Sequence, residues 1–381
     1  MPGIFNDLDL SPNPLELARQ RAHAASGYID LTSSNPTAQG LLFPPAILRE
    51  AAESYWASRR YAPDARGQPA ARSAIGHYYA QRTPPLALSI DQIFITASTS
   101  EAYSLLFALL ADPGDNLLAP NVTYPLFDYL AAIRGVELRN YQLDEKRGWA
   151  IDGPSLLAAA DERTRGVLIV SPHNPTGAVV QAPVAALETL ALPIICDEVF
   201  APFSYGVPSV PSLASLHPSL PIFTLNGISK LFALPDLKLG WIALSPSAHS
   251  AFAARLELIN DTFLGASGLA QHMLPSLFAH GTPFVDLMVA QVRANLDLAL
   301  ARLAACPALV ARPPDGGYYL FPAVRGWGDE EALALHLIER GVLAHPGFYY
   351  GEPPGTHLMI SALTAPAALA EGLERLVAAL E

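Results

Sequence analysis

The sequence predicts an α/β protein built on a mainly parallel seven-stranded sheet with helices on both faces, joined to a smaller α/β domain. Between Ile93 and Leu244, seven short β-type runs alternate with helical segments, which is the order of βαβ units. The runs are continuously apolar, a pattern typical of strands covered on both faces. Ligands of such sheets bind at the carboxyl ends of the strands, so the candidate site residues are those that follow the runs.

Each predicted strand is a distinct run of residues. In chain order the runs are IFIT (93–96), NLLAP (116–120), VELRNYQL (136–143), GVLIV (166–170), PIIC (193–196), IFTL (222–225) and GWIAL (240–244). Helical segments separate them, for example at residues 101–110 and 124–134.

The chain beyond the last run predicts a smaller α/β unit. A long helical stretch comes first, and it should break at Pro275 and again at residues 281–283. The later elements are GGYYLFP (316–322), a helix at 329–340, VLAHPG (342–347), HLMISAL (357–363) and a final helix. We therefore predict a large domain over residues 45–280 and a small domain formed by residues 1–44 and 281–381.

Composition and charge narrow the possible partners. The chain has 381 residues, 51% of them hydrophobic and 15% charged, so it can bury a large core and should divide into two lobes. A net charge of −12 and the lack of a polybasic run argue against nucleic acid and anionic membranes. The N-terminus lacks a basic start followed by an apolar stretch, and no apolar run is long enough to span a bilayer, so we expect a cytoplasmic protein. Cys196 and Cys306 are the only cysteines, which favours reduced thiols and predicts neither a disulfide framework nor a metal site.

Small hydroxyl residues follow the first run. Ser98, Thr99 and Ser100 come directly after residues 93–96 and before an apolar helix. Backbone N–H groups at a helix N-terminus, together with hydroxyls, form an anion site. Plain N-capping is the more common role of such residues, and only the position at a strand end favours the anion site.

A rigid turn follows the run at 166–170. Asn174 lies in the sequence HNPTG, and its amide can donate to an oxygen on a bound ring. Taken alone, the segment is an ordinary turn, and the adjacent His173 is more often a loop histidine than a catalyst.

An acid follows the run at 193–196 directly. A carboxylate at Asp197 needs a cationic partner or hydrogen bonds to offset its desolvation, and a protonated pyridine nitrogen would be such a partner. The neighbouring Glu198 better suits a capping role in the next turn.

A lysine follows the run at 222–225. Ser229 and Lys230 end the segment NGISK, and mostly apolar residues follow. An amine removed from water is more readily neutral and can attack an aldehyde. Most lysines are surface residues, so Lys230 would indicate little without the other motifs.

In this order, the NPTG, DE and SK motifs resemble the class I/II aminotransferases, which are fold-type I enzymes that use pyridoxal 5′-phosphate. The resemblance extends from about Asp30 to Leu380. It implies that Lys230 holds the cofactor as a Schiff base, that Asp197 binds the pyridine nitrogen and that Asn174 hydrogen-bonds the phenolic oxygen of the ring.

The resemblance also implies the remaining cofactor contacts. Tyr124 of NVTYP would stack on the ring face, and Ser98, Thr99 and Ser100 would line the phosphate. Ser229 and Lys238 would be further cofactor-binding residues. Tyr61, in the segment from Arg60 to Arg72, would reach the phosphate bound in the partner subunit, which implies a homodimer with shared active sites. In the C-terminal lobe, DGGYY (315–319) and HPGFYYG (345–351) look like two landmarks of the same family.

Four positions depart from the family pattern. Phe200 stands where a tyrosine usually bonds the ring oxygen, Gly227 where a phosphate-binding serine is common, and Lys238 where an arginine is usual. We expect Lys238 still to neutralise the phosphate, less rigidly than an arginine fork. Met359 stands where an arginine usually clamps the substrate α-carboxylate, which a thioether cannot do.

The Met359 departure leaves two interpretations open. Another cation, among Arg66, Arg19 and Arg21, reaches the substrate, or the substrate lacks a free α-carboxylate. The sequence does not decide between these two interpretations.

The function that these motifs predict is transfer of an amino group between an amino acid or amine and a keto acid through Lys230. An alternative is a lyase, such as one for C–S or other β-elimination, or a cyclase on the same scaffold, and the changes at Met359 and Phe200 raise its standing. A ligand-sensing domain without turnover is a third interpretation, which the retention of Lys230 and Asp197 disfavours. A nicotinamide dehydrogenase is disfavoured because no G-x-G-x-x-G follows a first strand.

Overall fold

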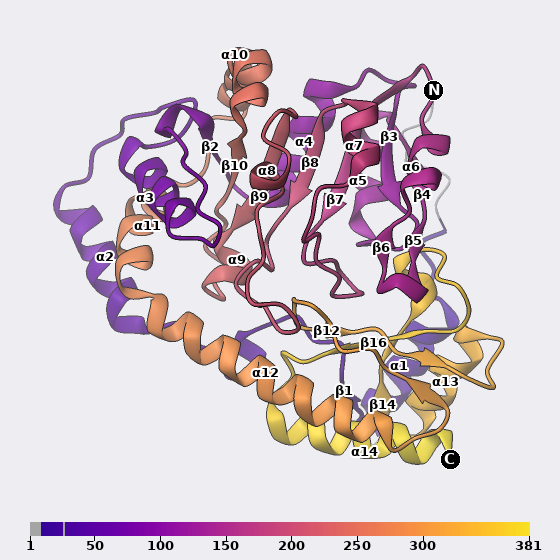
Figure 1. The fold of residues 1–381 in the computed structure, drawn as a ribbon. Helices are drawn as coiled ribbons and strands as arrows, with labels where there is room; N and C mark the ends of the chain where they lie inside the picture. The colour runs from indigo at the N-terminus through magenta and orange to yellow at the C-terminus, as the bar shows by residue number, and fades with distance from the viewer. Residues whose placement is uncertain (1–8, 26) are drawn as a thin grey trace.

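The computed structural model describes residues 9–25 and 27–381, and its centre is a seven-stranded sheet (Figure 1). The strands lie in the order β2-β10-β9-β8-β7-β3-β4. Their bounds are β2 (Ile93–Thr96), β3 (Asn116–Pro120), β4 (Glu137–Tyr141), β7 (Thr164–Val170), β8 (Ile194–Asp197), β9 (Ile222–Gly227) and β10 (Gly240–Leu244). Only β10 runs antiparallel to its neighbours; the other pairs are parallel. The predicted mainly parallel seven-stranded sheet is therefore confirmed.

Helices cover both faces of this sheet. One face packs on α4 (Thr99–Leu110), α5 (Leu126–Arg134) and α10 (Pro246–Thr262). The other face packs on α3 (Pro69–Ala80), α6 (Gly153–Ala159), α7 (Ala185–Leu190) and α8 (Leu213–Leu216). In β8, Ile195 belongs to the first core, whereas Ile194 and Cys196 belong to the second. This alternation explains why the first three positions of the strand, residues 194–196, are all apolar.

The helices after β10 differ from the expectation at Pro275. The chain forms α11 (Gly268–His280) and α12 (Thr282–Ala304), and it breaks at 263–267 and at Gly281, but not at Pro275, which lies inside α11. A proline inside a helix removes one backbone hydrogen bond. The helix continues here because α11 packs against α3 and α2 (Pro45–Ala57).

Residues 14–25 and 27–30 lie together with the elements of residues 309–380 in a smaller lobe (Figure 1). There β1 (Ile29–Asp30) pairs in parallel with β14 (Val342–Leu343). The long helix α12 runs from the large lobe to this one and packs along α14 (Pro366–Leu380). The other elements of the lobe are α1 (Pro14–Ala25), β11 (Leu309–Val310), β12 (Tyr319–Leu320), β13 (Ala323–Val324), α13 (Glu330–Glu339), β15 (His345–Pro346) and β16 (Leu358–Ser361).

Short elements complete the chain: the hairpin of β5 (Leu143–Asp144) and β6 (Ala150–Ile151), the helix α9 (Ile228–Leu231) after β9, and several 3-10 turns. The predicted division at residues 44/45 and 280/281 stays a prediction. No helix in the described ranges has both the length and the apolar character needed to cross a membrane. Residues 1–8, where the sequence shows no leader-like pattern, lie outside the described part of the chain.

Candidate active site

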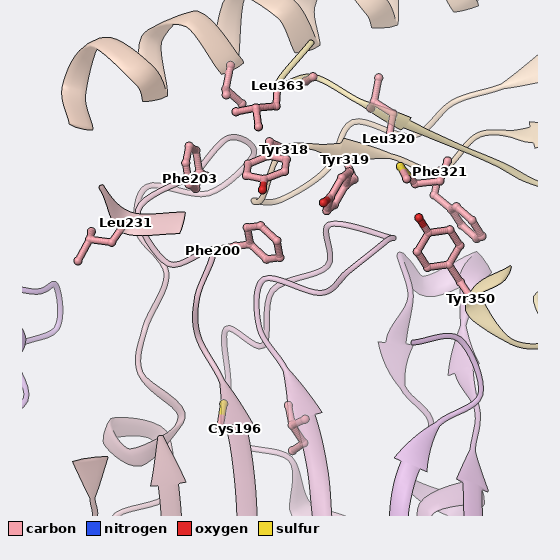
Figure 2. Close-up of a cluster of buried hydrophobic side chains, with 14 of the residues drawn as sticks. Cys196, Phe200, Phe203, Leu231, Tyr318, Tyr319, Leu320, Phe321, Tyr350 and Leu363 are labelled. Atoms are coloured by element: carbon pink, nitrogen blue, oxygen red, sulfur yellow. The ribbon is translucent and has the colours of Figure 1, made fainter. Parts of the chain in front are cut away.

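The candidate site lies at the edge of the sheet where β2, β7, β8 and β9 end. These four strands run in the same direction, so the segments that follow them meet there. Aromatic residues from the small lobe cover this edge. Figure 2 shows Tyr318 and Tyr319 facing Phe200, beyond the end of the strand that contains Cys196.

Asp197 is the last residue of β8 and is 7% exposed. Its carboxylate accepts hydrogen bonds from the Tyr103 hydroxyl at 2.8 Å and from the Val199 backbone N–H at 3.0 Å. Burial raises the pKa of Asp197 to about 6, although both hydrogen bonds and the nearby Lys230 charge oppose this shift. Asp197 is thus a desolvated acid whose ionised form a contacting cation would stabilise.

Lys230 lies in the single turn of α9, directly after β9. Its Nζ is 5.9 Å from the centroid of the Tyr318 ring. The residue is partly buried, and the neighbours Ile228 and Leu231 are buried. The structure thus places an amine close to Asp197 and under the aromatic layer of the small lobe.

Asn174 and Tyr124 line one cavity of about 440 Å³. The cavity takes residues from both lobes: Thr32, Ser34, Tyr124, Pro125, Tyr129, Asn174, Tyr319, His345, Tyr349, Tyr350 and Met359. Asn174 is buried, and its Oδ1 has no hydrogen-bond partner within residues 9–25 and 27–381. Tyr124 is 40% exposed and rests edge-on against Phe127, at 5.8 Å between ring centroids.

The predicted anion site forms the N-terminus of α4. Ser98 is the N-cap residue, and its Oγ accepts a hydrogen bond from the Glu101 N–H at 3.1 Å. Thr99 and Ser100 are the first two residues of the helix, so their N–H groups point out of its N-terminal end. Both readings of this motif therefore fit: Ser98 caps the helix, while free N–H groups remain for an anion.

In the single chain, neither Lys238 nor Tyr61 is among the residues that line the cavity. Lys238 is exposed and has a φ of 50°, in the segment between α9 and β10. Tyr61 is 88% exposed in the segment before α3. Ser229, beside Lys230, is partly buried in α9. Their roles at a phosphate stay predictions.

Several site residues were missed by reasoning on the sequence. Tyr103 lies within α4, where nothing but its helical spacing of four from Thr99 sets it apart. Tyr319 and His345 belong to sequence segments noticed as family landmarks, but their entry into the cavity depends on how the small lobe packs. Tyr318 covers Lys230 for the same reason.

The structure accounts for two departures from the family pattern. Phe200 is buried and packs edge-on against Tyr318 and Tyr319, at 4.9 and 5.7 Å between ring centroids, so it supports the aromatic layer. A Cβ on Gly227 would lie 2.9 Å from the Leu239 carbonyl oxygen. Close packing with the start of β10 therefore excludes a serine there without a backbone shift.

The arrangement fits pyridoxal phosphate on three observations. Asp197 is a buried acid that no cation among the described residues contacts, and a protonated ring nitrogen would supply one. Asn174 has a buried side-chain oxygen, Oδ1, that lacks a partner among the described residues and could accept a hydrogen bond from a ring hydroxyl. The free N–H groups at the N-terminus of α4 end at the same edge of the sheet. Asp197, Asn174 and the start of α4 could therefore hold the ring nitrogen, a ring oxygen and the phosphate, with Lys230 facing the aldehyde.

A lysine beside a buried acid at this edge of an α/β sheet defines the class of fold-type I pyridoxal-phosphate enzymes. Comparison with known proteins places the chain within that class. Residues 26–376 match the model of the family described as aminotransferase class I and II, and the chain belongs to this family. It is a pyridoxal-phosphate-dependent aminotransferase.

Its relatives carry different aminotransferase names. The chain is 28% identical to an alanine aminotransferase of Mycobacterium tuberculosis (strain ATCC 25618 / H37Rv) over 362 residues, which cover 91% of this chain and 84% of the relative. It is also 28% identical to a tyrosine aminotransferase of Homo sapiens over 334 residues, which cover 84% of this chain and 70% of the relative. None of the relatives named here supports the lyase or cyclase alternative.

Solved structures share the fold. An aminotransferase from Escherichia coli superposes with a TM-score of 0.87 at 24% identity, covering 100% of this chain and 98% of that one. A single mutant of the Thermus thermophilus aspartate aminotransferase superposes with a TM-score of 0.84 at 23% identity, covering 100% of this chain and 99% of that one. The predicted fold type is confirmed by these likenesses.

Proposed function

We propose that this aminotransferase works through Lys230, with Asp197 as the partner of the cofactor's ring nitrogen. The observation that supports this most strongly is the buried Asp197 carboxylate, held by Tyr103 and Val199 and close to the Lys230 amine. The reaction is transfer of an amino group from a small-molecule donor to a keto acid acceptor. Pyridoxal phosphate, when bound, supplies the aldehyde that takes the amino group and a ring that stabilises negative charge at the substrate carbon.

Lys230 serves as both anchor and proton carrier. Its Nζ lies 5.9 Å from the centroid of the Tyr318 ring, and the residue is partly buried, so the amine is held at the edge of the sheet where the candidate site lies. With the cofactor and a donor bound, the Lys230 amine would take the proton from the substrate Cα and return it in the second part of the transfer, as a general base and then a general acid.

Asp197 keeps the ring nitrogen protonated. The Tyr103 hydroxyl and the Val199 N–H fix both carboxylate oxygens, so the acid cannot turn away from the ring. Asn174 and Tyr124 line the same cavity, where Asn174 would hydrogen-bond the ring oxygen and Tyr124 would cover one ring face. Together these contacts hold the reacting carbon in line with Lys230.

The phosphate would be held by the N-terminus of α4, through Ser98, Thr99 and Ser100. Lys238 would neutralise its charge, and Ser229 would be a further cofactor contact. A second copy of the chain would supply Tyr61, whose 88% exposed ring is available to a neighbour. The homodimer with shared sites and the cytoplasmic location stay predictions.

Chemical tagging tests the role of Lys230 directly. The sequence has only three lysines, Lys146, Lys230 and Lys238, so the attachment point can be assigned without ambiguity. Borohydride reduction of the holoenzyme followed by peptide mapping should leave a pyridoxyl group on Lys230.

The matched variants are Lys230→Ala and Lys146→Ala. Lys230→Ala should lose the tag and about 10²–10⁴-fold or more of turnover, because it removes both the anchor and the proton carrier. Lys146→Ala changes an exposed lysine far along the chain and should keep both. A tag on Lys146 or Lys238, or full turnover in Lys230→Ala, would refute the proposed role.

A further inference from the structure

The cavity that contains Asn174 and Tyr124 lies beside Lys230, and it is the space in which a substrate would meet the cofactor. Tyr319 links the two, since it lines the cavity and feels the charge of Lys230. Five of the lining residues are tyrosines, and Thr32 and Ser34 add two further hydroxyls.

The lining of this cavity contains no permanent charge. Among the described residues that form its wall there is no arginine, lysine, aspartate or glutamate. His345 is the one lining side chain that could become a cation, and burial lowers its pKa despite the opposing charge of Asp30. At neutral pH the histidine ring is therefore uncharged.

Met359 and His345 sit side by side in the wall. They are directly opposed residues of the antiparallel pair β15 and β16, so both side chains face the cavity. Met359 is 2% exposed, and the His345 Nδ1 is 3.0 Å from the Tyr350 hydroxyl. The position where the family usually has a carboxylate-binding arginine thus holds a thioether, and a neutral imidazole ring lies beside it.

The three arginines considered from the sequence do not replace that clamp. Arg66 binds Glu257 through Nε and Nη2, at 2.9 and 2.6 Å, and its Nη1 donates to the Asp91 carbonyl at 3.0 Å. Arg21 is exposed on α1.

Arg19 is the nearest of the three, but its charge is already paired. It lines a separate cavity of about 230 Å³ that shares the walls of His345 and Tyr349. Both Nε and Nη2 are 2.7 Å from the Glu16 carboxylate, and Nη1 is 3.1 Å from the Tyr28 hydroxyl. A fork engaged in a bidentate pair cannot clamp a second carboxylate without breaking the first.

We propose that this cavity is built for a primary amine whose reacting carbon bears no carboxylate, with a neutral aromatic or hydroxyl-bearing body. The inference rests on the proposed function and names its substrate class. Removing a carboxylate from water into a wall without a cation is unfavourable, since hydrogen bonds from neutral donors offset only part of the desolvation. Aromatic surface and hydroxyl groups, in contrast, find tyrosine rings and matching donors and acceptors on every side.

The reaction balances as an ordinary transfer. The carbon that carries the amine is oxidised by two electrons to a carbonyl, whose oxygen comes from water, and the nitrogen and electrons pass to the cofactor. The return half-reaction with a keto acid meets the same uncharged wall. We expect it to need a high acceptor concentration.

Matched pairs of donors test the inference on the holoenzyme. The pairs are tyramine with L-tyrosine and 2-phenylethylamine with L-phenylalanine. For each donor, the rate at which the visible absorption band of the cofactor disappears is measured in a single turnover. We expect each amine to react at least ten-fold more efficiently than its amino acid. A preference for the amino acids would overturn the inference and leave the aminotransferase function intact.

Binding of unreactive ligands gives a second readout that does not depend on turnover. Calorimetry should show 3-phenylpropan-1-ol binding the holoenzyme more tightly than 3-phenylpropionate. If no amine and no amino acid reacts, the proposed function fails. The binding comparison of the alcohol with the carboxylate then still shows whether the cavity disfavours a carboxylate. Tighter binding of the carboxylate would refute the inference.

Three variants locate the cause. Met359→Arg should shift both readouts towards carboxylates by about ten-fold or more, and if it does not fold, the wild-type comparisons still decide. Arg19→Gln should leave the donor preference unchanged. Arg60→Gln tests whether the cation next to Tyr61 reaches the cavity of a neighbouring subunit. This variant should also leave the donor preference unchanged. Loss of carboxylate binding in either arginine variant would identify the missing clamp and end the proposal.

Discussion

At the scale of single residues, Asp197 shows how burial and function are linked. The acid is buried, two donors hold it, and no cation in the described part of the chain contacts it. The raised pKa, about 6, measures this cost. A bound cationic ring nitrogen would remove the cost, so the same feature that destabilises the apoprotein favours cofactor binding.

Replacing Asp197 by Asn should reveal this cost as a pH-dependent difference in stability. The pKa of the acid is raised from 3.8 to about 6, so the folded apoprotein binds the proton more tightly than the unfolded chain does. The stabilisation from the protonated acid is present below pH 4 and is lost as the pH rises through 6. Relative to Asp197→Asn, which is neutral throughout, the wild-type apoprotein should lose up to about 3 kcal/mol between pH 4 and pH 8.

Urea unfolding of both apoproteins at several pH values measures this difference. The comparison of two proteins cancels the titration of every other group that they share. A difference that stays constant between pH 4 and pH 8 would show that Asp197 is not desolvated as described. The variant should also bind the cofactor more weakly, because the ring nitrogen loses its charged partner.

At the scale of elements, the site depends on how closely β10 approaches the start of α4. Gly240 pairs with Thr96 across the antiparallel strands, and its Cα faces the turn that leads into the helix. A Cβ at this position would lie 2.9 Å from both the Ser98 carbonyl carbon and the Thr99 nitrogen. The predicted phosphate-binding turn is therefore positioned by a backbone contact that only glycine allows.

Gly240→Ala should displace this turn and weaken cofactor binding. Overpacking of this kind costs about 1–3 kcal/mol, and we expect the dissociation constant for pyridoxal phosphate to rise about ten-fold or more. Gly328→Ala is the matched control, because nothing lies within 4 Å of a Cβ built there. Fluorescence titration of the two apoproteins measures the effect, and wild-type affinity in Gly240→Ala would show that the turn does not bind the phosphate.

The elements also show what could be predicted from the sequence. The seven sheet strands were found from their β-type runs, which are mostly apolar; β4, with Glu137, Arg139 and Asn140, is the exception. Asn174 in the turn after β7, Asp197 at the end of β8 and Lys230 after β9 followed from that assignment. Pro275 was misassigned because its helix is held by packing on α2 and α3, which no local signal reveals. Tyr103 was missed because a tyrosine on the buried face of a helix looks like any core residue.

At the scale of the whole molecule, the site is completed by the contact between the two lobes. Thr123 donates its N–H to the Tyr350 carbonyl at 2.6 Å, and Val122 bridges Gly351, so the segment after β3 is joined to the small-lobe segment that lines the cavity. His345 and Met359 enter the cavity through this packing. Sequence patterns predict which side of a strand is buried, but they do not predict how two lobes pack against each other. The sequence therefore showed that the usual arginine is replaced by Met359, but not which residues surround Met359.

The largest assembly implied for this chain is a dimer whose subunits complete each other's sites, and mixed dimers can test it. Tyr61→Phe removes one hydroxyl that would donate to the phosphate. Hydrogen bonds to charged groups contribute about 1.5–3 kcal/mol, so the variant should bind the cofactor about ten- to a hundred-fold more weakly. Lys230→Ala subunits keep Tyr61 but cannot turn over.

Mixing the two variants gives dimers in which one site combines an intact Lys230 with a Tyr61 from the other subunit. If Tyr61 acts across the interface, these mixed dimers regain wild-type cofactor affinity at half of their sites, together with the turnover of those sites. If Tyr61 instead serves its own subunit, or if the chain does not dimerise, the mixture keeps the weak affinity of the Tyr61→Phe parent. Isolating the mixed species with two different affinity tags and titrating the cofactor distinguishes these outcomes, because only a shared site can be repaired by a partner that is itself inactive.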